Sequence, residues 1–118
     1  MLNKLRSAEN GAESRKLYLL DVDCGQPTFN LPGTVALLEC VQEGDFATLE
    51  PQMVPVSETF INSANPATDP SAYLSVIESK LRFYSELSSK NKRLVVNTCG
   101  WVEGLGAEIQ LRIINLAR

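Results

Sequence analysis

The chain has 118 residues, and its 11 Lys and Arg residues against 14 Asp and Glu residues give a formal net charge of −3 at pH 7. This length fits one domain at most, and a hydrophobic content of 44% excludes a disordered or fibrous chain. Because the sequence contains no histidine, it excludes His-based acid–base catalysis, Ser-His and Cys-His nucleophile pairs and most zinc sites.

Cysteine usage and hydropathy predict an intracellular protein with reduced thiols and no membrane partner. Cys24, Cys40 and Cys99 are widely spaced and form no C-x-x-C pair, which argues against a metal cluster or a disulfide framework. No apolar run reaches the roughly 18 residues of a membrane span. The start of the chain also lacks the apolar stretch of a signal peptide.

The first predicted elements are the end of a helix and a buried strand. Residues 1–16 are typical of a helix end followed by a polar loop, with Gly11 as a terminator. Residues 17–22 form a continuous apolar run that closes on acidic residues, which is typical of a strand buried on both faces of a parallel sheet. The polar turn that follows extends this unit to residue 29.

The middle of the chain, residues 30–70, is predicted to be an irregular excursion because prolines and glycine-containing turns break it into short pieces. Thr34–Cys40 and Met53–Val56 are candidate strands within it, and the rest is predicted to be loop. Asp69 then supplies a helix N-cap, with Pro70 at the first helical position.

The second half of the chain predicts a helix, a strand and another helix. Apolar residues at helical spacing place the helices over residues 71–89 and 105–118, and the strand with its following turn covers residues 93–101. This order predicts an α/β fold with a parallel sheet and right-handed crossovers. In such sheets functional groups gather at the carboxyl ends of the strands, here Asp21–Gln26 and Asn97–Trp101.

The first strand end carries two carboxylates, Asp21 and Asp23, followed by Gly25 and Gln26. An apolar strand that ends in Asp is the general form of a Walker B element, whose carboxylate holds Mg²⁺ or its waters beside a nucleotide. The alternative is that the two aspartates only cap the strand or begin a turn, with Gln26 as a loop amide. Cys24 is interpreted as a small buried thiol rather than a nucleophile.

The second strand end has glycines before a helix, which allow backbone N–H groups to approach an anion. Trp101 offers a stacking face for a base, although a lone tryptophan also fits a core position. The spacing of a dinucleotide-binding fingerprint is absent. The basic residues Lys90, Lys92 and Arg93 are interpreted as a solvated helix end that is favourable to the helix dipole.

Together the two strand ends resemble the eukaryotic polynucleotide 5′-hydroxyl kinases. The resemblance rests on Tyr18–Phe29 (YLLDVDCGQPTF) with the Pro-Gly pair at 32–33, on Val95–Val102 (VVNTCGWV), and on the separation between them. The family includes the nucleolar kinase of pre-rRNA processing and the RNA kinase of the pre-mRNA cleavage and tRNA-splicing complexes. The likeness covers roughly residues 15–118, and the phenylalanine after Gln-Pro-Thr favours the nucleolar branch.

This resemblance implies ATP-dependent phosphorylation of a nucleic-acid 5′-hydroxyl, with ATP and Mg²⁺ as cofactors. It implies that Asp23 is the Walker B carboxylate beside Mg²⁺ and the attacking hydroxyl, with Gln26 as a catalytic helper and Asp21 in a supporting, cofactor-binding role. Thr98, Gly100 and Trp101 match the clasp that grips the end of the RNA. The implied partners are an RNA 5′ end and RNA-processing proteins, and the implied location is the nucleus and nucleolus. Phosphoryl transfer asks mainly for positioning and charge neutralisation, which needs no histidine.

The chain departs from that family in two respects that affect its activity, at the ATP-phosphate loop and at the C-terminal lid. It contains no G-x-x-x-x-G-K-[ST] segment, so the loop that should cradle the ATP phosphates is missing. The expected fold is therefore a partial P-loop NTPase, three-layered with a mostly parallel sheet, which lacks the P-loop strand and the C-terminal arginine-bearing lid. We expect residues 1–118 to be the middle of a kinase domain and to be inert or nearly so alone.

Three alternatives remain open from the sequence. The chain can be a non-catalytic module that holds RNA ends or a processing partner. Within the family, it can belong to the mRNA-cleavage and tRNA-splicing branch. It can also be a piece of another P-loop ATPase or GTPase, which the T-x-G-W segment disfavours.

Overall fold

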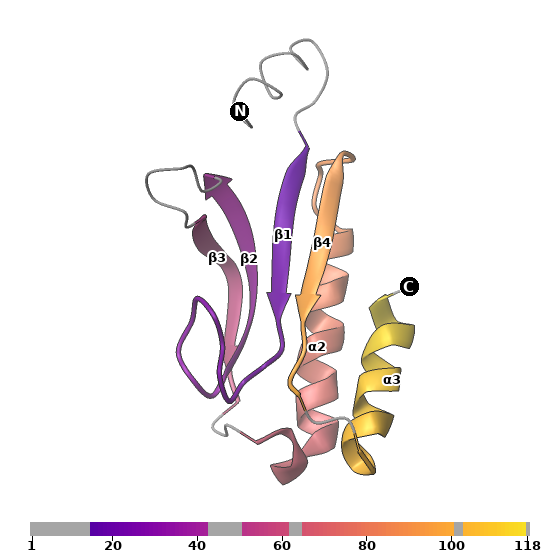
Figure 1. The fold of residues 1–118 in the computed structure, drawn as a ribbon. Helices are drawn as coiled ribbons and strands as arrows, with labels where there is room; N and C mark the ends of the chain where they lie inside the picture. Colours follow the sequence, from indigo (N-terminus) through magenta and orange to yellow (C-terminus); the bar gives the residue numbers. More distant parts are fainter. Residues whose placement is uncertain (1–14, 43–50, 62–64, 101–102, 118) are drawn as a thin grey trace.

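The computed structural model describes residues 15–42, 51–61, 65–100 and 103–117. Within these ranges the chain forms a four-stranded sheet and two α-helices (Figure 1). The α/β class predicted from the sequence is confirmed. The helix end predicted at residues 1–16 lies outside the described residues, except for its last two positions.

The strands are β1 (Lys16–Asp21), β2 (Thr34–Gln42), β3 (Gln52–Phe60) and β4 (Lys92–Asn97), in the order β3-β2-β1-β4. β1 pairs in parallel with β4, whereas β1 with β2 and β2 with β3 are antiparallel. The sheet is therefore mixed, and the prediction of a mostly parallel sheet is wrong. The parallel pair is the part that was predicted from the order strand, helix, strand.

The largest difference from prediction lies in the middle of the chain, where β2 and β3 form a long antiparallel pair. Both candidate strands are confirmed, but each extends beyond its predicted bounds. Prolines suggested loop here, yet Pro55 is accommodated because β3 is an edge strand of the described sheet. A register shift between Leu37 and Leu38 occurs where Pro55 pairs with Leu38, so the ladder adjusts locally rather than ending.

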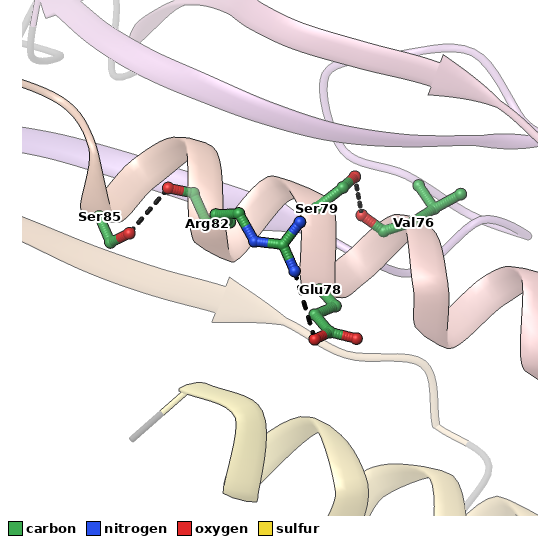
Figure 2. A network of polar contacts seen from close by, with 5 residues as sticks. All are labelled: Val76, Glu78, Ser79, Arg82 and Ser85. Atoms are coloured by element: carbon green, nitrogen blue, oxygen red, sulfur yellow. Dashed lines mark hydrogen bonds and ion pairs between the residues drawn. The ribbon is translucent and has the colours of Figure 1, made fainter.

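Helix α2 (Pro70–Ser85) begins where the sequence predicted and ends about one turn earlier. The Asp69 carboxylate accepts a hydrogen bond from the Ala72 backbone N–H at 3.1 Å, and Pro70 occupies the first turn. On its solvent face, Figure 2 shows the Arg82 guanidinium against the Glu78 carboxylate, one turn apart at 3.5 Å. This ion pair lies on the exposed face of the helix, whereas Tyr73, Ile77 and Lys80 lie on its buried face.

Helix α3 (Leu105–Ala117) packs against α2, and both lie on the same side of the sheet (Figure 1). Their buried side chains join those of β1 and β2 in one core, whose members are Tyr18, Leu20, Val22, Cys24, Val35, Leu37, Tyr73, Ile77, Ile109 and Ile113. Of the three layers predicted, the described residues provide two, the sheet and one helix layer.

No helix in the described ranges is long and apolar enough to cross a membrane.

Lys80 of α2 reaches back to the sheet and donates hydrogen bonds to the hydroxyls of Ser57 at 2.8 Å and Thr59 at 2.6 Å. Burial lowers the pKa of this ammonium group below its ordinary value. Ser57 and Thr59 of β3 thus face the helix layer, where their hydroxyls accept hydrogen bonds from Lys80.

Candidate functional site

The two strand ends singled out in the sequence lie next to each other in the structure. Asp21 and Asn97 are paired residues at the carboxyl ends of the parallel strands β1 and β4 (Figure 1). The Val22 backbone N–H donates to the Asn97 carbonyl oxygen at 3.0 Å, which continues the ladder one step beyond β1. The prediction that chemistry-bearing segments gather at one edge of the sheet is confirmed for this pair.

Asp21 is fully buried and is the acceptor at the centre of the site. Its Oδ1 accepts hydrogen bonds from the Asn97 side-chain amide at 3.1 Å and from the Asp23 backbone N–H at 3.2 Å. Its Oδ2 accepts from the Thr28 backbone N–H at 2.8 Å. Neither ion pair found among the described side chains involves Asp21, so these neutral donors stabilise the buried carboxylate.

Asp23 has a different environment, although it is only two residues away. Its side chain is partly exposed, and its Oδ1 accepts a hydrogen bond from the Gln26 backbone N–H at 3.2 Å. This contact closes a short Asx-type turn that presents the carboxylate at the edge of the sheet. The Gln26 side chain is exposed beside it. Asp23 is therefore available to a ligand, whereas Asp21 is enclosed.

The turn between these aspartates is held from the helix layer. The Tyr73 hydroxyl of α2 donates to the Val22 carbonyl oxygen at 2.6 Å, and the Cys24 N–H donates to the same oxygen at 3.0 Å. The Cys24 carbonyl in turn accepts from the Gly33 N–H at 2.7 Å. Gly33 has a φ of +85° and an added Cβ would lie 2.8 Å from the Phe60 ring, so a side chain is strained here.

Burial also sets the chemistry of the two protonated groups behind this turn. It raises the pKa of the Cys24 thiol, which supports the interpretation of Cys24 as a buried structural thiol rather than a nucleophile. Burial likewise raises the pKa of the Tyr73 hydroxyl well above its ordinary value. Tyr73 therefore keeps its proton and serves as a hydrogen-bond donor.

The second predicted segment follows β4 directly. Thr98 and Gly100 are exposed, and Trp101 lies outside the described residues. The carbonyl of Cys99, which lies between Thr98 and Gly100, accepts a hydrogen bond from the Gln110 side-chain amide of α3 at 2.8 Å. A Cβ added at Gly100 would meet no described atom within 4 Å, so the space beside this residue is open.

The site offers one available carboxylate, that of Asp23, which suits a single Mg²⁺ ion and not a multi-carboxylate metal cluster. Across the described part of the chain, no group of three or more His, Cys, Asp or Glu residues could hold a metal. Mg²⁺ usually keeps several waters and takes one or two carboxylates together with substrate phosphates. The partly exposed Asp23 fits that donor set. By contrast, the sequence offers no backbone loop for the ATP phosphates.

Four contributors to this site were not predicted as site residues from the sequence. They are the Asn97 side chain, the Thr28 backbone N–H, the Tyr73 hydroxyl and the Gln110 amide. The sequence does place Asn97 directly before the Thr-x-Gly-Trp segment, which was a signal for its inclusion. The Lys90, Lys92 and Arg93 cluster lies at the other end of β4, and Lys92 there binds the α2 terminus as the helix-end interpretation predicted.

Comparison with known proteins places the chain in a family. A family model described as "mRNA cleavage and polyadenylation factor CLP1 P-loop" matches residues 2–118. A relative from Arabidopsis thaliana, named polynucleotide 5′-hydroxyl-kinase NOL9, is 32% identical over 109 residues, which cover 85% of this chain and 29% of that protein.

Two further relatives carry related names. Polynucleotide 5′-hydroxyl-kinase GRC3 of Gibberella zeae is 33% identical over 116 residues, covering 92% of this chain and 16% of that protein. Polyribonucleotide 5′-hydroxyl-kinase Clp1 of Danio rerio is 29% identical over 97 residues, covering 78% of this chain and 22% of that protein. The chain thus spans less than a third of the length of each of these relatives.

Proposed function

This chain belongs to the CLP1 P-loop family, and on that premise we propose that the natural full-length protein transfers the γ-phosphoryl group of ATP to the 5′-hydroxyl of RNA. One observation carries the proposal. The partly exposed Asp23 carboxylate stands at the end of the parallel β1–β4 pair, and the neighbouring strand leads directly into the exposed Thr98–Gly100 segment. The kinase names of the relatives supply the reaction class.

In this proposal Asp23 holds Mg²⁺ and lies beside the attacking 5′-hydroxyl, with Gln26 as its helper. The metal neutralises charge that develops on the transferred phosphoryl group. Asp21 has a supporting role at the cofactor site, while Thr98, Gly100 and Trp101 hold the RNA end. Backbone N–H groups near Gly100 suit a phosphate, and the indole of Trp101 suits a base.

We further propose that the fold of the whole domain is that of a P-loop NTPase, of which these residues are the central part. Because no G-x-x-x-x-G-K-[ST] segment occurs in the 118 residues, we expect this chain alone to transfer no phosphate at a measurable rate. A chain that phosphorylates RNA alone would contradict this expectation.

Within the family we favour the pre-rRNA-processing branch, with nuclear and nucleolar location and RNA-processing proteins as partners. The Gln26–Phe29 sequence supports this choice. Fluorescent tagging of the full-length protein tests the location. Nucleoplasmic rather than nucleolar signal favours the mRNA-cleavage and tRNA-splicing branch.

The decisive test is the Asp23→Asn substitution in the full-length protein, assayed by transfer of labelled phosphate from ATP to a 5′-hydroxyl RNA oligonucleotide. We expect the rate to fall at least about a hundredfold, since a neutral amide cannot balance the charge of Mg²⁺. Asp69→Asn is the matched control, because asparagine caps a helix about as well as aspartate. Unchanged activity of Asp23→Asn would reject the Walker B role.

A second test addresses the clasp through Gly100→Ala. Because an added methyl group meets no described atom, the fold should tolerate it, and a higher KM for RNA then reports close approach of the ligand.

The other candidate function, a non-catalytic RNA-end-binding module, is favoured by the missing ATP-phosphate loop. It predicts that the 118-residue chain itself binds single-stranded RNA without transferring any phosphate.

A further inference from the structure

We propose that Asp21 and Asn97 form a positioning pair that sets the Asp23 turn against the Thr98–Gly100 segment. The pair is a carboxylate and a carboxamide joined by the 3.1 Å hydrogen bond from Asn97 Nδ2 to Asp21 Oδ1. This inference rests on the proposed function, because it assigns to the pair the alignment of the two halves of that kinase site. Neither residue touches the reacting atoms in this assignment.

The burial of Asp21 separates its role from that of Asp23. Asp21 has no exposed surface and both of its oxygens accept hydrogen bonds from the protein. A direct bond to a metal ion or a phosphate group would require at least one of these contacts to break. Asp21 thus acts through the groups it holds, which are the backbone at Asp23, the backbone at Thr28 and the amide of Asn97.

Each of these contacts leads to a segment that the proposed reaction needs. The Asp23 N–H contact fixes the start of the turn that carries the partly exposed carboxylate. The Thr28 N–H contact folds back the loop that contains Gln26. Asn97 is the last residue of β4 and directly precedes Thr98. Its contact with Asp21 therefore fixes the position from which the chain continues to Gly100.

Asn97 is suited to this link by its place in the sheet and by its two polar groups. It lies directly beside Asp21 in the parallel register, and its carbonyl oxygen accepts the Val22 N–H while its side chain donates to Asp21. One residue therefore joins both the backbone and the side chain of the first strand end. An apolar residue here would leave a buried carboxylate oxygen with one donor fewer, which is costly.

The helix layer supports the same alignment from behind. Tyr73 of α2 holds the Val22 carbonyl between the two aspartates, and Gln110 of α3 holds the Cys99 carbonyl between Thr98 and Gly100. The two halves of the site are each attached to a helix, and the Asp21–Asn97 hydrogen bond is a side-chain contact that joins them to each other. Its loss should therefore misalign the halves without unfolding either one.

The test uses the full-length protein and steady-state kinetics with ATP and a 5′-hydroxyl RNA. We expect Asn97→Ala to lower kcat about ten- to hundredfold with little change in the KM for ATP, because a displacement of about 1 Å between reacting groups has effects of this size. Asp21→Asn should lower kcat similarly, and the two changes together should cost little more than either alone. Exchange of the pair, Asp21→Asn with Asn97→Asp, should recover part of the rate, since an amide and a carboxylate again face each other.

The control is Ile77→Val, which trims a fully buried core residue of α2 and should lower the melting temperature without lowering kcat. Additive effects of the two single changes, or an Asn97→Ala protein whose kcat equals that of the wild type, would overturn the positioning pair while leaving the kinase proposal intact. A wild-type protein that transfers no phosphate would overturn the kinase proposal itself, and the positioning role with it.

Discussion

Each end of the β1–β4 pair holds a charged side chain that makes several hydrogen bonds, Lys92 at one end and Asp21 at the other, but the two side chains have different roles. At the amino end, the Lys92 ammonium donates to the Tyr84 and Leu87 carbonyls at 2.7 and 3.1 Å and lies 4.6 Å from the Tyr84 ring centre. At the carboxyl end, Asp21 accepts from three donors. Both hydrogen-bond acceptors of the Lys92 side chain lie within eight residues along the chain, whereas the Asn97 side chain that donates to Asp21 is 76 residues away from it.

This contrast separates a local cap from a long-range link. Lys92 places a positive charge on the carbonyl end of α2, where the helix dipole favours a cation, so it stabilises one helix terminus. Asp21 instead connects segments that are far apart in sequence and that follow two paired strands. The first arrangement contributes to stability alone, and the second contributes to stability and, in our proposal, to the geometry of a reaction.

The largest expected effect on stability is that of Asp21→Ala. Removal of this fully buried carboxylate leaves the Asp23 and Thr28 N–H groups and the Asn97 amide, which are partly buried, without their acceptor. We expect unfolding in urea to require roughly 3 kcal/mol less free energy. A loss below 1 kcal/mol would show that water replaces the carboxylate, and the link would then be weak.

Lys92→Met should have the next largest effect. It keeps the length and the apolar stem of the side chain but removes two hydrogen bonds and the cation–π contact with Tyr84. We expect a loss of about 1–2 kcal/mol in the free energy of unfolding, with phosphate transfer by the full-length protein unchanged. Reduced kcat in this variant would contradict the separation of the two ends.

How far the sequence predicted the molecule follows the same division between local and long-range contacts. The Asp69 cap, helix α2 and strands β1 and β4 were predicted because their signals lie within a few residues of each other. The antiparallel pairing of β2 with β3 was not, because Pro55 reads as a breaker until the strand is known to lie at an edge.

The site shows this limit most clearly. Asp21, Asp23 and the segment after Asn97 were predicted as site residues from the sequence, and the adjacency of the two strand ends followed from the parallel crossover. The different exposure of the two aspartates was not predictable, since alternation along a strand does not say which carboxylate the loop will enclose. The role of the Tyr73 hydroxyl, which holds the turn, was not predicted from the sequence either.

Tyr73→Phe should cost about 1 kcal/mol, because the Val22 carbonyl loses one donor and keeps the Cys24 N–H. The variant should also differ from the wild type in how its free energy of unfolding depends on pH. Burial raises the pKa of Tyr73 above its ordinary value of 10.0, so above about pH 10 the unfolded chain releases this proton while the folded chain keeps it. Stability should therefore fall more steeply above pH 10 in the wild type than in the variant. Parallel curves from urea denaturation at pH 8 to 11 would contradict the assignment.

The smallest expected effect is that of Glu78→Ala on the solvent face of α2 (Figure 2). The Glu78–Arg82 ion pair joins two side chains that are 55% and 64% exposed, and their closest charged atoms are 3.5 Å apart. Such pairs contribute at most about 0.5 kcal/mol and less at high salt. This variant measures what an exposed polar contact is worth in the same helix that carries Tyr73 and whose carboxyl end is capped by the Lys92 side chain. If its loss of stability equalled that of Lys92→Met, the effect of Lys92→Met could not be attributed to the cap of the helix terminus. The two ends of β1 and β4 would then differ only in how far apart along the chain the contacting residues lie.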